Sequence, residues 1–556
     1  MGSKDGRWWN ERVFYQIYPL SFRDSNGDGL GDIPGIIEKI PYLRDIGVGG
    51  VWICPFYDCR LEYDYGYGPS DLRSVHPLLG TMEQYFDLVD SAHRAGIKVL
   101  LEWAATNTSI YGAWFKESRS SRSNPKADWY HWFNEIPNNW VSYSGGNAWH
   151  YCPERNQYYL GLFFKEHAEL NWRNPDVRRA VLDAFESWVI TGIDGFRIDT
   201  IDMYVKDAFF RDNPPKVVDS HEFLDPSDPI HGSKYARWLI PEHLQFEHLH
   251  DRGQPETLEI MQEMRAICNR HGDDLLLIGE VDIQTTAGKQ LCENGMSVAF
   301  NFSLASSQWG ARPFRQVLER EIRELNNCLC CNTFSNHDMR RAISRFSVGD
   351  YLEDLKRAKV LAALTLTLPG VPMLYYGEEI GMPDVMLSYH ELRDPISRNN
   401  WHIGALRETG RGPMQWDGGV NAGFSDCKPW MKMSATTEDV SVAKQSTDPE
   451  SMLSYYKRLI ALRNSSRVLQ YGDFMVDSGG GNDILVHRRS YDDETLAVLL
   501  NFSNRMIEVE ALAYKIIPET AGVILHLYGE KKLVDGKIVL GPYDVVITRQ
   551  GGGAKW

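Results

Sequence analysis

The chain has 556 residues, which exceeds one ordinary domain and indicates one large domain with additions, or about two or three domains. Apolar residues make up 43% of the sequence and aromatic residues 12%, enough for a packed core, so an intrinsically disordered protein is excluded. A formal net charge of −16 without a long basic run disfavours nucleic acid and anionic membranes as partners, and favours a neutral ligand.

We expect neither a signal peptide nor a membrane anchor. The N-terminal residues lack a basic stretch followed by an apolar core, and the most apolar run, 360–374, is interrupted by two prolines and a glycine. The nine cysteines are an odd number, and the group Cys328, Cys330 and Cys331 has no partner pair at zinc-ribbon spacing. We therefore predict buried thiols in a reducing, cytoplasmic setting.

The first part of the chain alternates apolar, strand-like runs with amphipathic helical stretches. In chain order these are a strand at 13–18, a helix at 33–46, a strand at 50–55, a helix at 82–95 and a strand at 98–103. Residues 107–175 lose this alternation and are rich in Ser, Asn, Pro and Trp. We expect an inserted, loop-rich domain there.

The alternation then resumes. It comprises a helix at 175–191, a strand at 194–199, a helix at 254–271, strands at 275–280, 298–302, 332–335 and 371–375, and a helix at 449–464. Eight strands with intervening helices predict an α/β fold, the (β/α)₈ TIM barrel. A second irregular insert, 383–444, precedes the last helix.

A separate β domain is predicted after the barrel. From residue 467 the chain shows short alternating strands at 484–488, 495–501, 523–528 and 545–548. We expect an antiparallel β-sandwich at 467–556, with the barrel formed by residues 1–106 and 176–466 and the inserted domain by 107–175.

Three acidic residues follow the ends of predicted barrel strands: Asp199, Glu280 and Asp338. The C-terminal ends of barrel strands meet at one mouth, so we expect these carboxylates to converge although they are far apart in sequence. Arg197 lies on the same strand face as Asp199 and can hold it ionised by charge pairing. Taken alone, that pair could equally be an ordinary structural ion pair.

Two carboxylates on either side of a scissile bond are the requirement for glycoside hydrolysis. Asp199 suits the nucleophile, because Arg197 favours its charged form. Glu280 suits the proton donor, because it follows the apolar run 275–278 and desolvation raises a carboxyl pKa. A separation of about 5 Å would give a retaining double displacement.

Five segments carry a specific resemblance, and they occur in order over nearly the whole chain. They are Asp24-Ser-Asn-Gly-Asp-Gly-Leu-Gly-Asp32, Gly195-Phe-Arg-Ile-Asp199, Ile278-Gly-Glu280, Asn336-His-Asp338 and Pro413-Met-Gln-Trp-Asp417. With them the chain resembles the α-amylase family of glycoside hydrolases (family 13), and within it the oligo-1,6-glucosidase and α-glucosidase subfamily. The resemblance implies that Asp199 is the nucleophile, Glu280 the acid/base, and Asp338 the ligand of the 2- and 3-hydroxyls of the sugar in subsite −1.

The same resemblance implies further substrate-binding residues. Matching positions are Asp64, Tyr67, Phe163, His337 and Arg411, with Arg197 orienting Asp199. Pairing of Asp64 with Arg411 would close the non-reducing end of the pocket. We therefore expect an exo-acting enzyme for short substrates.

The segment 24–32 is a candidate cation loop. Its alternating oxygen groups suit Ca²⁺ or Mg²⁺, and the ligands would be Asp24, Asn26, Asp28, the Leu30 carbonyl and Asp32. It is not an EF-hand, because the twelfth position is a glycine rather than the bidentate glutamate. The resemblance supports a structural cation against a plain turn rich in Asp and Asn, and no organic cofactor is expected.

Three sites depart from the family pattern near the −1 sugar. Asn107 stands where the family has the histidine that hydrogen-bonds the 6-hydroxyl; Asn can still donate, but it is shorter and uncharged. The family's Gln-Pro-Asp-Leu-Asn reads His167-Ala-Glu-Leu-Asn171, and Gly68 is usually Asp. An altered sugar preference, favoured glucosyl transfer and a decayed enzyme compete as explanations, and the three intact acids count against decay.

Three functions follow as hypotheses. The leading one is a cytoplasmic retaining α-glucosidase for maltose-, sucrose- or aryl-glucoside-like substrates. For its linkage preference, Thr200 directly follows the nucleophile, and a Thr at that position resembles the α-1,4- or sucrose-active members of the subfamily. The second is a glucosyltransferase or sucrose isomerase, motivated by the altered pocket and the unusual insert 391–412. The third is a non-catalytic sugar-binding or transporter-associated protein.

Overall fold

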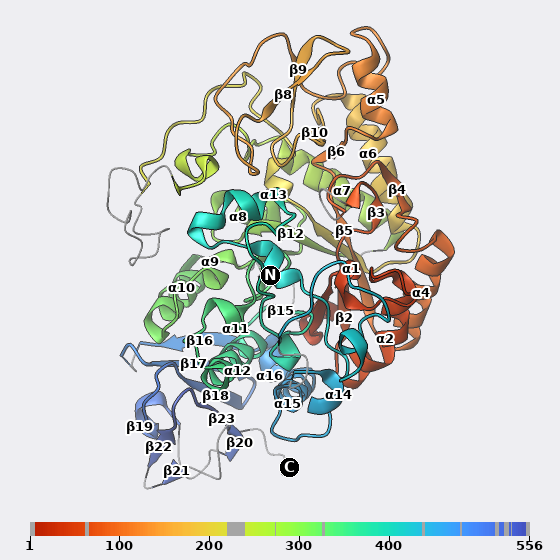
Figure 1. The fold of residues 1–556 in the computed structure, drawn as a ribbon. Helices are drawn as coiled ribbons and strands as arrows, with labels where there is room; N and C mark the ends of the chain where they lie inside the picture. The colour runs from red at the N-terminus through yellow and green to blue at the C-terminus, as the bar shows by residue number, and fades with distance from the viewer. Residues whose placement is uncertain are drawn as a thin grey trace.

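A computed structural model of the chain describes residues 6–61, 66–218, 239–272, 274–324, 329–435, 440–478, 481–516, 522–526, 533–534 and 536–551. Its centre is a closed barrel of eight parallel strands (Figure 1). In spatial order these are β1 (Phe14–Ile17), β15 (Val371–Tyr375), β14 (Leu329–Asn332), β13 (Val298–Phe300), β12 (Leu276–Asp282), β11 (Gly195–Ile198), β5 (Lys98–Trp103) and β2 (Gly50–Ile53). The predicted (β/α)₈ barrel is confirmed.

A helix follows each barrel strand and covers the barrel from outside. In chain order these helices are α2 (Ile33–Asp45), α4 (Met82–Arg94), α6 (Pro175–Val189), α7 (Thr257–His271), α8 (Thr286–Glu293), α10 (Ala311–Glu324), α12 (Tyr351–Thr367) and α15 (Met452–Ser465). Asp32 caps α2, Thr81 and Gln84 form a capping box on α4, and Asn174 caps α6. Local sequence signals therefore mark where these helices begin.

One barrel strand lies earlier in the chain than predicted. The strand expected at 332–335 is β14, and it pairs with β13 and β15 through residues before Thr333. The prediction was wrong because Cys330 and Cys331 supply the buried side chains of this strand, and thiols behave as small apolar groups in a core. Cys330 and Cys331 are buried thiols, as expected, and Cys328 lies outside the described residues.

Between β5 and α6 the chain leaves the barrel and forms a layer of short strands. β6 (Asn107–Ser109) pairs with β10 (His167–Glu169), and β9 (Gln157–Leu160) lies between β7 (Trp132–Phe133) and β8 (Trp149–Cys152). Helix α5 (Ala113–Ser120) accompanies these strands, and Figure 1 shows the layer at the top of the view. The β6–β10 ladder directly continues the end of β5, so it reaches the barrel mouth.

The chain ends in antiparallel sheets, as predicted. One has the order β16 (Asp473–Asp477), β17 (Ile484–Tyr491), β18 (Glu494–Asn501), β23 (Val545–Gln550), β20 (Gly522–His526), and the other β19 (Ile507–Glu510), β22 (Lys537–Leu540), β21 (Leu533–Val534). Val486 and Leu499 of the first sheet pack with Val509 and Ile538 of the second, as in a sandwich. Strands β16, β19, β21 and β22 were not predicted, because two to five residues give only a weak alternation.

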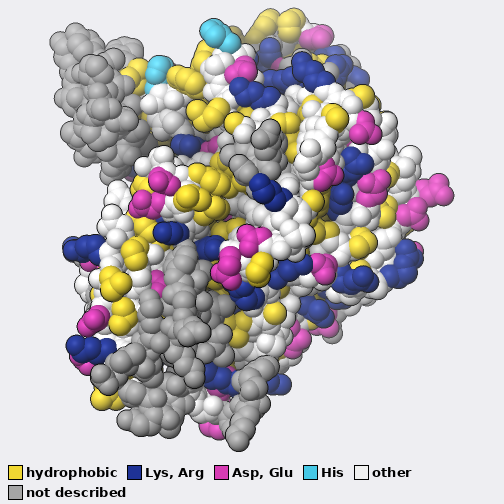
Figure 2. Space-filling model, turned by 60° about the horizontal axis from the view of Figure 1, so that its bottom comes forward, with side chains coloured by type: hydrophobic (Ala, Val, Ile, Leu, Met, Phe, Trp, Pro, Cys, Tyr) yellow, Lys and Arg dark blue, Asp and Glu magenta, His cyan; other side chains and the backbone are white. Residues whose placement is uncertain are grey.

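Figure 2 shows one face of the molecule, on which hydrophobic side chains lie among charged ones. On the face shown in Figure 2, Lys and Arg side chains are interspersed with Asp and Glu, so neither sign forms one continuous patch over the described part of that face. None of the described helices combines the length and the apolar character needed to cross a membrane.

Candidate active site

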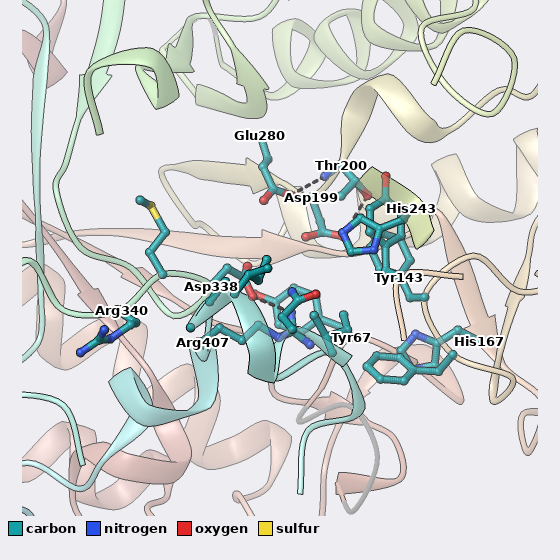
Figure 3. A pocket seen from close by; sticks show the side chains of 18 of the residues that line it. Tyr67, Tyr143, His167, Asp199, Thr200, His243, Glu280, Asp338, Arg340 and Arg407 are labelled. Atoms are coloured by element: carbon teal, nitrogen blue, oxygen red, sulfur yellow. Dashed lines mark hydrogen bonds and ion pairs between the residues drawn. The ribbon is translucent and has the colours of Figure 1, made fainter. Parts of the chain in front are cut away.

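The C-terminal ends of the barrel strands open into a cavity of about 660 Å³. Its lining comes from the strand ends, the β6–β10 ladder and the insert that follows β15 (Figure 3). The lining residues considered below are Tyr67, Asn107, Tyr143, Phe163, His167, Asp199, Thr200, His243, Glu280, Asp338 and Arg407. The volume suits a ligand of disaccharide size, since small-molecule sites measure about 300–1,000 Å³.

Arg197 of β11 lies beneath the cavity and holds three carboxylates with one guanidinium. Its Nη1 donates to Asp199 Oδ1 over 2.7 Å and to Glu102 of β5, and its Nη2 pairs with Glu280 Oε1 over 2.8 Å. The Arg197 side chain is buried, and its planar fork can serve several carboxylate oxygens in a fixed geometry. Asp199 and Glu280 are therefore fixed on neighbouring strands and face the same space.

Thr200 forms a second link between these two acids. Its N–H donates to Glu280 Oε2 over 2.9 Å and its hydroxyl to Asp199 Oδ2 over 3.1 Å (Figure 3). Its backbone is left-handed, with φ of 37°, which is rare for a β-branched residue and costs about 1–3 kcal/mol. The unusual conformation is the one in which the Thr200 N–H reaches Glu280.

Glu280 has the environment of a proton donor. Burial raises the pKa of Glu280 to about 7; Asp199 and Asp338 add to the rise, while Arg197 and the Thr200 N–H oppose it. A carboxyl that still holds its proton near neutral pH can protonate a leaving group. The shift agrees with the expectation from the apolar run that precedes Glu280.

Asp338 lies across the cavity from Glu280 in a cationic frame (Figure 3). Its Oδ1 accepts from Arg407 over 2.7 Å and from Arg411 over 3.0 Å, and its Oδ2 lies 3.0 Å from His337 Nε2. Burial alone would raise the pKa of Asp338, but these three partners lower it well below its usual value. Asp338 is thus a carboxylate that can accept hydrogen bonds from sugar hydroxyls.

His337 is buried behind Asp338 with both ring nitrogens engaged. Gln16 Nε2 lies 2.7 Å from Nδ1, and the Tyr67 hydroxyl bonds to Nε2, with the Tyr67 and His337 rings nearly parallel at 5.3 Å between centroids. Burial lowers the pKa of His337. A neutral imidazole accepts from Gln16 at Nδ1 and carries its one proton on Nε2, where the Tyr67 hydroxyl oxygen and Asp338 share it.

An aromatic wall lies on the side of the inserted layer. The ring of Tyr143 stacks on Phe163, with centroids 5.1 Å apart at 17°, and lies 5.0 Å from the ring of His243. Burial lowers the pKa of His243 to about 4, so its ring is neutral near pH 7. Such rings offer flat apolar faces on which a sugar can pack.

Arg407 belongs to the insert 391–412, where no functional residue before Arg411 was predicted. Its Nε and Nη2 donate to Asp394 over 2.7 and 3.0 Å, while its Nη1 reaches Asp338. Asp394 is buried and caps the short helix α13 (Pro395–Asn399). The insert therefore supplies a fixed cation to the site.

The structure brings most of the predicted site residues together. Asp199, Glu280, Asp338, Tyr67, Asn107, Phe163 and Thr200 line the cavity. Arg197, His337 and Arg411 lie behind it and bond to its carboxylates. Asp64 lies outside the described residues, so its pairing with Arg411 stays a prediction.

The lining residues that sequence reasoning missed include three that matter for the chemistry of the site: Tyr143, His243 and Arg407. All three lie outside regular strands and long helices, where periodicity gives no side-chain direction. The only sequence signal for Arg407 was the unusual composition of its insert.

The predicted cation loop, 24–32, is stabilised by its own hydrogen bonds. Asp24 accepts hydrogen bonds from three backbone N–H groups of the loop and from the Ser425 hydroxyl. A carboxylate has about four lone-pair positions, so these four donors fill them. Asp32 accepts from Ser25 and from the first turn of α2. In this conformation Asp24 has no lone pair to spare, and among the described residues no group of three or more His, Cys, Asp or Glu side chains forms a metal site.

Comparison with known proteins agrees with this geometry. The sequence model of the alpha-amylase catalytic domain matches residues 16–472. The chain belongs to the α-amylase family. A family relative named probable alpha-glucosidase, from Rhizobium meliloti (strain 1021), is 36% identical over 530 residues, which cover 92% of this chain and 93% of the relative. An oligo-1,6-glucosidase from Parageobacillus thermoglucosidasius is 34% identical over 567 residues, with coverage of 94% and 95%.

Solved structures extend the likeness over the full α-amylase fold. An alpha-glucosyl transfer enzyme superposes with a TM-score of 0.87 at 31% identity, covering 98% of this chain and 100% of that one. The trehalulose synthase of Pseudomonas mesoacidophila MX-45 gives 0.85 at 27% identity, with coverage of 98% and 99%. The α-amylase fold of this chain is thus shared by proteins named as glucosidases, as a transfer enzyme and as a synthase.

Proposed function

We propose that the protein is an exo-acting, retaining α-glucosidase that hydrolyses short α-glucosides. The observation that carries this proposal is the Arg197 fork, which binds Asp199 and Glu280 together while burial raises the pKa of Glu280 to about 7. Relatives named alpha-glucosidase and oligo-1,6-glucosidase support the substrate class.

The reaction follows from the two carboxyl groups. The Asp199 carboxylate attacks C1 of the glucosyl group as the Glu280 proton passes to the glycosidic oxygen, so the C1–O bond breaks and an ester to Asp199 forms. Glu280 then takes a proton from water, which attacks C1 and releases Asp199. One guanidinium serving both acids favours the short separation of retaining enzymes, about 5 Å.

The cationic frame around Asp338 supports exo action. Arg407 and Arg411 both donate to Asp338 Oδ1, and Arg407 is itself held by Asp394. A single terminal sugar can place its 2- and 3-hydroxyls on Asp338, whereas a longer chain would need to pass this frame. The non-catalytic alternative is disfavoured because such a protein has no need to keep Asp199, Glu280 and Asp338 together in one cavity.

Glucosyl transfer is the second candidate, and the aromatic wall favours it. Tyr143, Phe163 and His243 offer an acceptor sugar a binding surface within the cavity that also contains Glu280. An acceptor bound there would compete with water for the glucosyl group. Neighbouring structures named as an alpha-glucosyl transfer enzyme and a trehalulose synthase support this possibility.

A substrate panel separates these functions. We expect the purified protein to release glucose from at least one of maltose, isomaltose, sucrose and p-nitrophenyl α-glucoside, with the α-anomer formed first by NMR. Longer saccharides or rearranged disaccharides as the main products would instead select transfer or isomerisation. Absence of turnover on the whole panel would exclude both enzymatic functions.

We also propose a structural Ca²⁺ at the loop 24–32. Asn26, Asp28 and the Leu30 carbonyl would supply oxygen ligands, and Asp24 and Asp32 would have to exchange their present hydrogen-bond donors for the ion. We expect EDTA to lower Tm by about 3 °C or more, and added Ca²⁺ to restore it, because a ligand of the native state stabilises it by mass action. An unchanged Tm would show that the hydrogen bonds of the loop suffice.

A cytoplasmic location is part of the proposal. The eight cysteines in the described part of the chain are thiols, which persist in reducing compartments. Cell fractionation against a cytosolic marker tests it, and recovery with secreted or membrane-bound proteins would contradict it.

A further inference from the structure

Thr106 lies between β5 and β6, behind the cavity rather than in its lining. Its hydroxyl is 2.7 Å from the hydroxyl of Thr200, and the residue is only 1% exposed. Its carbonyl accepts from the Leu170 N–H over 3.1 Å, so the chain just after β10 holds its backbone in place. Thr106 is therefore a fixed, buried group beside the residue that links the two acids.

The hydroxyl groups of Thr106 and Thr200 form a chain with one possible direction. A threonine hydroxyl carries one proton, and a carboxylate can only accept. The Thr200 proton is used on Asp199 Oδ2, 3.1 Å away, so the Thr200 oxygen accepts from Thr106. The chain runs from Thr106 through Thr200 to Asp199, and hydrogen bonds linked in this way polarise and strengthen one another in a buried site.

The same chain bears on the backbone of Thr200. Its left-handed conformation is unfavourable, so the contacts around it must hold it in place. The Thr200 N–H donates to Glu280 Oε2, and its carbonyl accepts from the Met203 N–H over 2.8 Å. Thr106 adds a contact from the end of a neighbouring barrel strand, β5.

Both acids depend on where Thr200 lies. Its hydroxyl fixes one oxygen of Asp199. Burial raises the pKa of Glu280 to about 7, and the Thr200 N–H opposes this rise. If Thr200 left its position, the Asp199 carboxylate would be free to rotate and Glu280 would lose a hydrogen-bond donor. One small hydroxyl group behind the cavity can therefore affect the nucleophile and the proton donor together.

We propose that Thr106 is a positioning residue for the reaction: it donates to the Thr200 hydroxyl and so holds Thr200 in the conformation that aligns Asp199 and Glu280. The inference rests on the proposed function, which assigns the nucleophile and the proton donor. Thr106 does not line the cavity, so its removal should change kcat and leave KM for maltose nearly unchanged.

Thr106→Val removes the donor to Thr200 while keeping the shape of the side chain. We expect it to lower kcat for maltose about five- to tenfold, the range for losing one buried hydrogen bond, with KM within about twofold of wild type. Thr106→Ser keeps the donor and should retain most of the wild-type kcat. Steady-state kinetics with purified protein measure both variants.

The pH profile gives a signature that a purely structural role of Thr106 would not produce. Loss of the Thr200 N–H would raise the pKa of Glu280 further, because a hydrogen bond to the charged form of a carboxyl lowers its pKa. The alkaline decline of kcat/KM for maltose should therefore move to higher pH in Thr106→Val, by about half a pH unit. The variant leaves in place the charged groups that act on Glu280: Arg197, Asp199, Asp202, Arg252 and Asp338.

Thr108→Val is the matched control. Thr108 is also buried, its hydroxyl lies 2.6 Å from that of Tyr130, and it does not line the cavity. The variant loses a hydroxyl–hydroxyl bond of the same kind, away from Thr200. It should lower Tm but leave kcat and the pH profile unchanged.

A double-mutant cycle tests whether Thr106 acts through Thr200. In a Thr200→Val background no hydroxyl accepts the hydrogen bond, so adding Thr106→Val should change kcat by less than about twofold. If Thr106→Val does not fold, as judged by thermal unfolding, Thr106→Cys takes its place, because a thiol is only a weak donor.

Equal losses in the two backgrounds, or an effect of Thr106→Val no larger than that of Thr108→Val, would overturn the inference while leaving the glucosidase activity intact. An alkaline decline at the wild-type pH in Thr106→Val would also overturn it. A wild type without turnover on any α-glucoside would instead reject the proposed function.

Discussion

Asp199→Ala is expected to lower kcat/KM for p-nitrophenyl α-glucoside by at least about 10⁴-fold, because no other group can form the covalent intermediate. Thr200 and Arg197 each hold one oxygen of the Asp199 carboxylate, so the side chain has a fixed line of attack. Steady-state kinetics with purified protein measure the effect. Activity within about tenfold of wild type would reject Asp199 as the nucleophile.

Two further measurements separate a chemical role for Asp199 from a structural one. Azide added to Asp199→Ala should attack C1 from the vacated side as p-nitrophenolate leaves, giving the β-glucosyl azide, which NMR can identify. Asp194→Asn is the matched control, since Asp194 lies just before β11 and pairs with Lys98 over 2.6 Å, away from the cavity lining. It should change stability but leave kcat within about twofold, as expected for a group that does not contact the substrate.

Glu280→Gln is expected to affect substrates according to their leaving group. Maltose needs a proton on its departing oxygen, so its kcat/KM should fall about 10³-fold, within the range for loss of general acid catalysis. The p-nitrophenolate ion leaves without a proton, so kcat/KM for the aryl substrate should fall by less than about tenfold on the same reasoning. Equal losses for both substrates would contradict the acid role.

The pH profile carries an independent signature of Glu280. Its acid form declines as pH rises through about 7, so kcat/KM for maltose in the wild type should fall on the alkaline side of that pH. The alkaline decline should be absent from Glu280→Gln. Glu321→Gln is the matched control, because burial also raises the pKa of Glu321 to about 7 although it bonds to Asn301 and Gln284 rather than lining the cavity.

The sequence by itself determined the barrel and the positions of its three acids. Apolar runs alternate with capped amphipathic helices, and a barrel sends the C-terminal end of every strand to one mouth. Asp199 and Glu280 could therefore be placed together from order alone. The position of β14 was misjudged because buried thiols, rather than branched apolar residues, form that strand.

Only the tertiary structure decided which side chains complete the site. Arg407 reaches Asp338 from an irregular insert, and the left-handed backbone of Thr200 brings its N–H to Glu280. Neither contact follows a helical or strand period, so neither could be deduced from spacing. The shared place of Asn107 and His167 in the cavity lining is of the same kind: they are 60 positions apart in the numbered sequence, and the ladder of β6 and β10 brings their strands together.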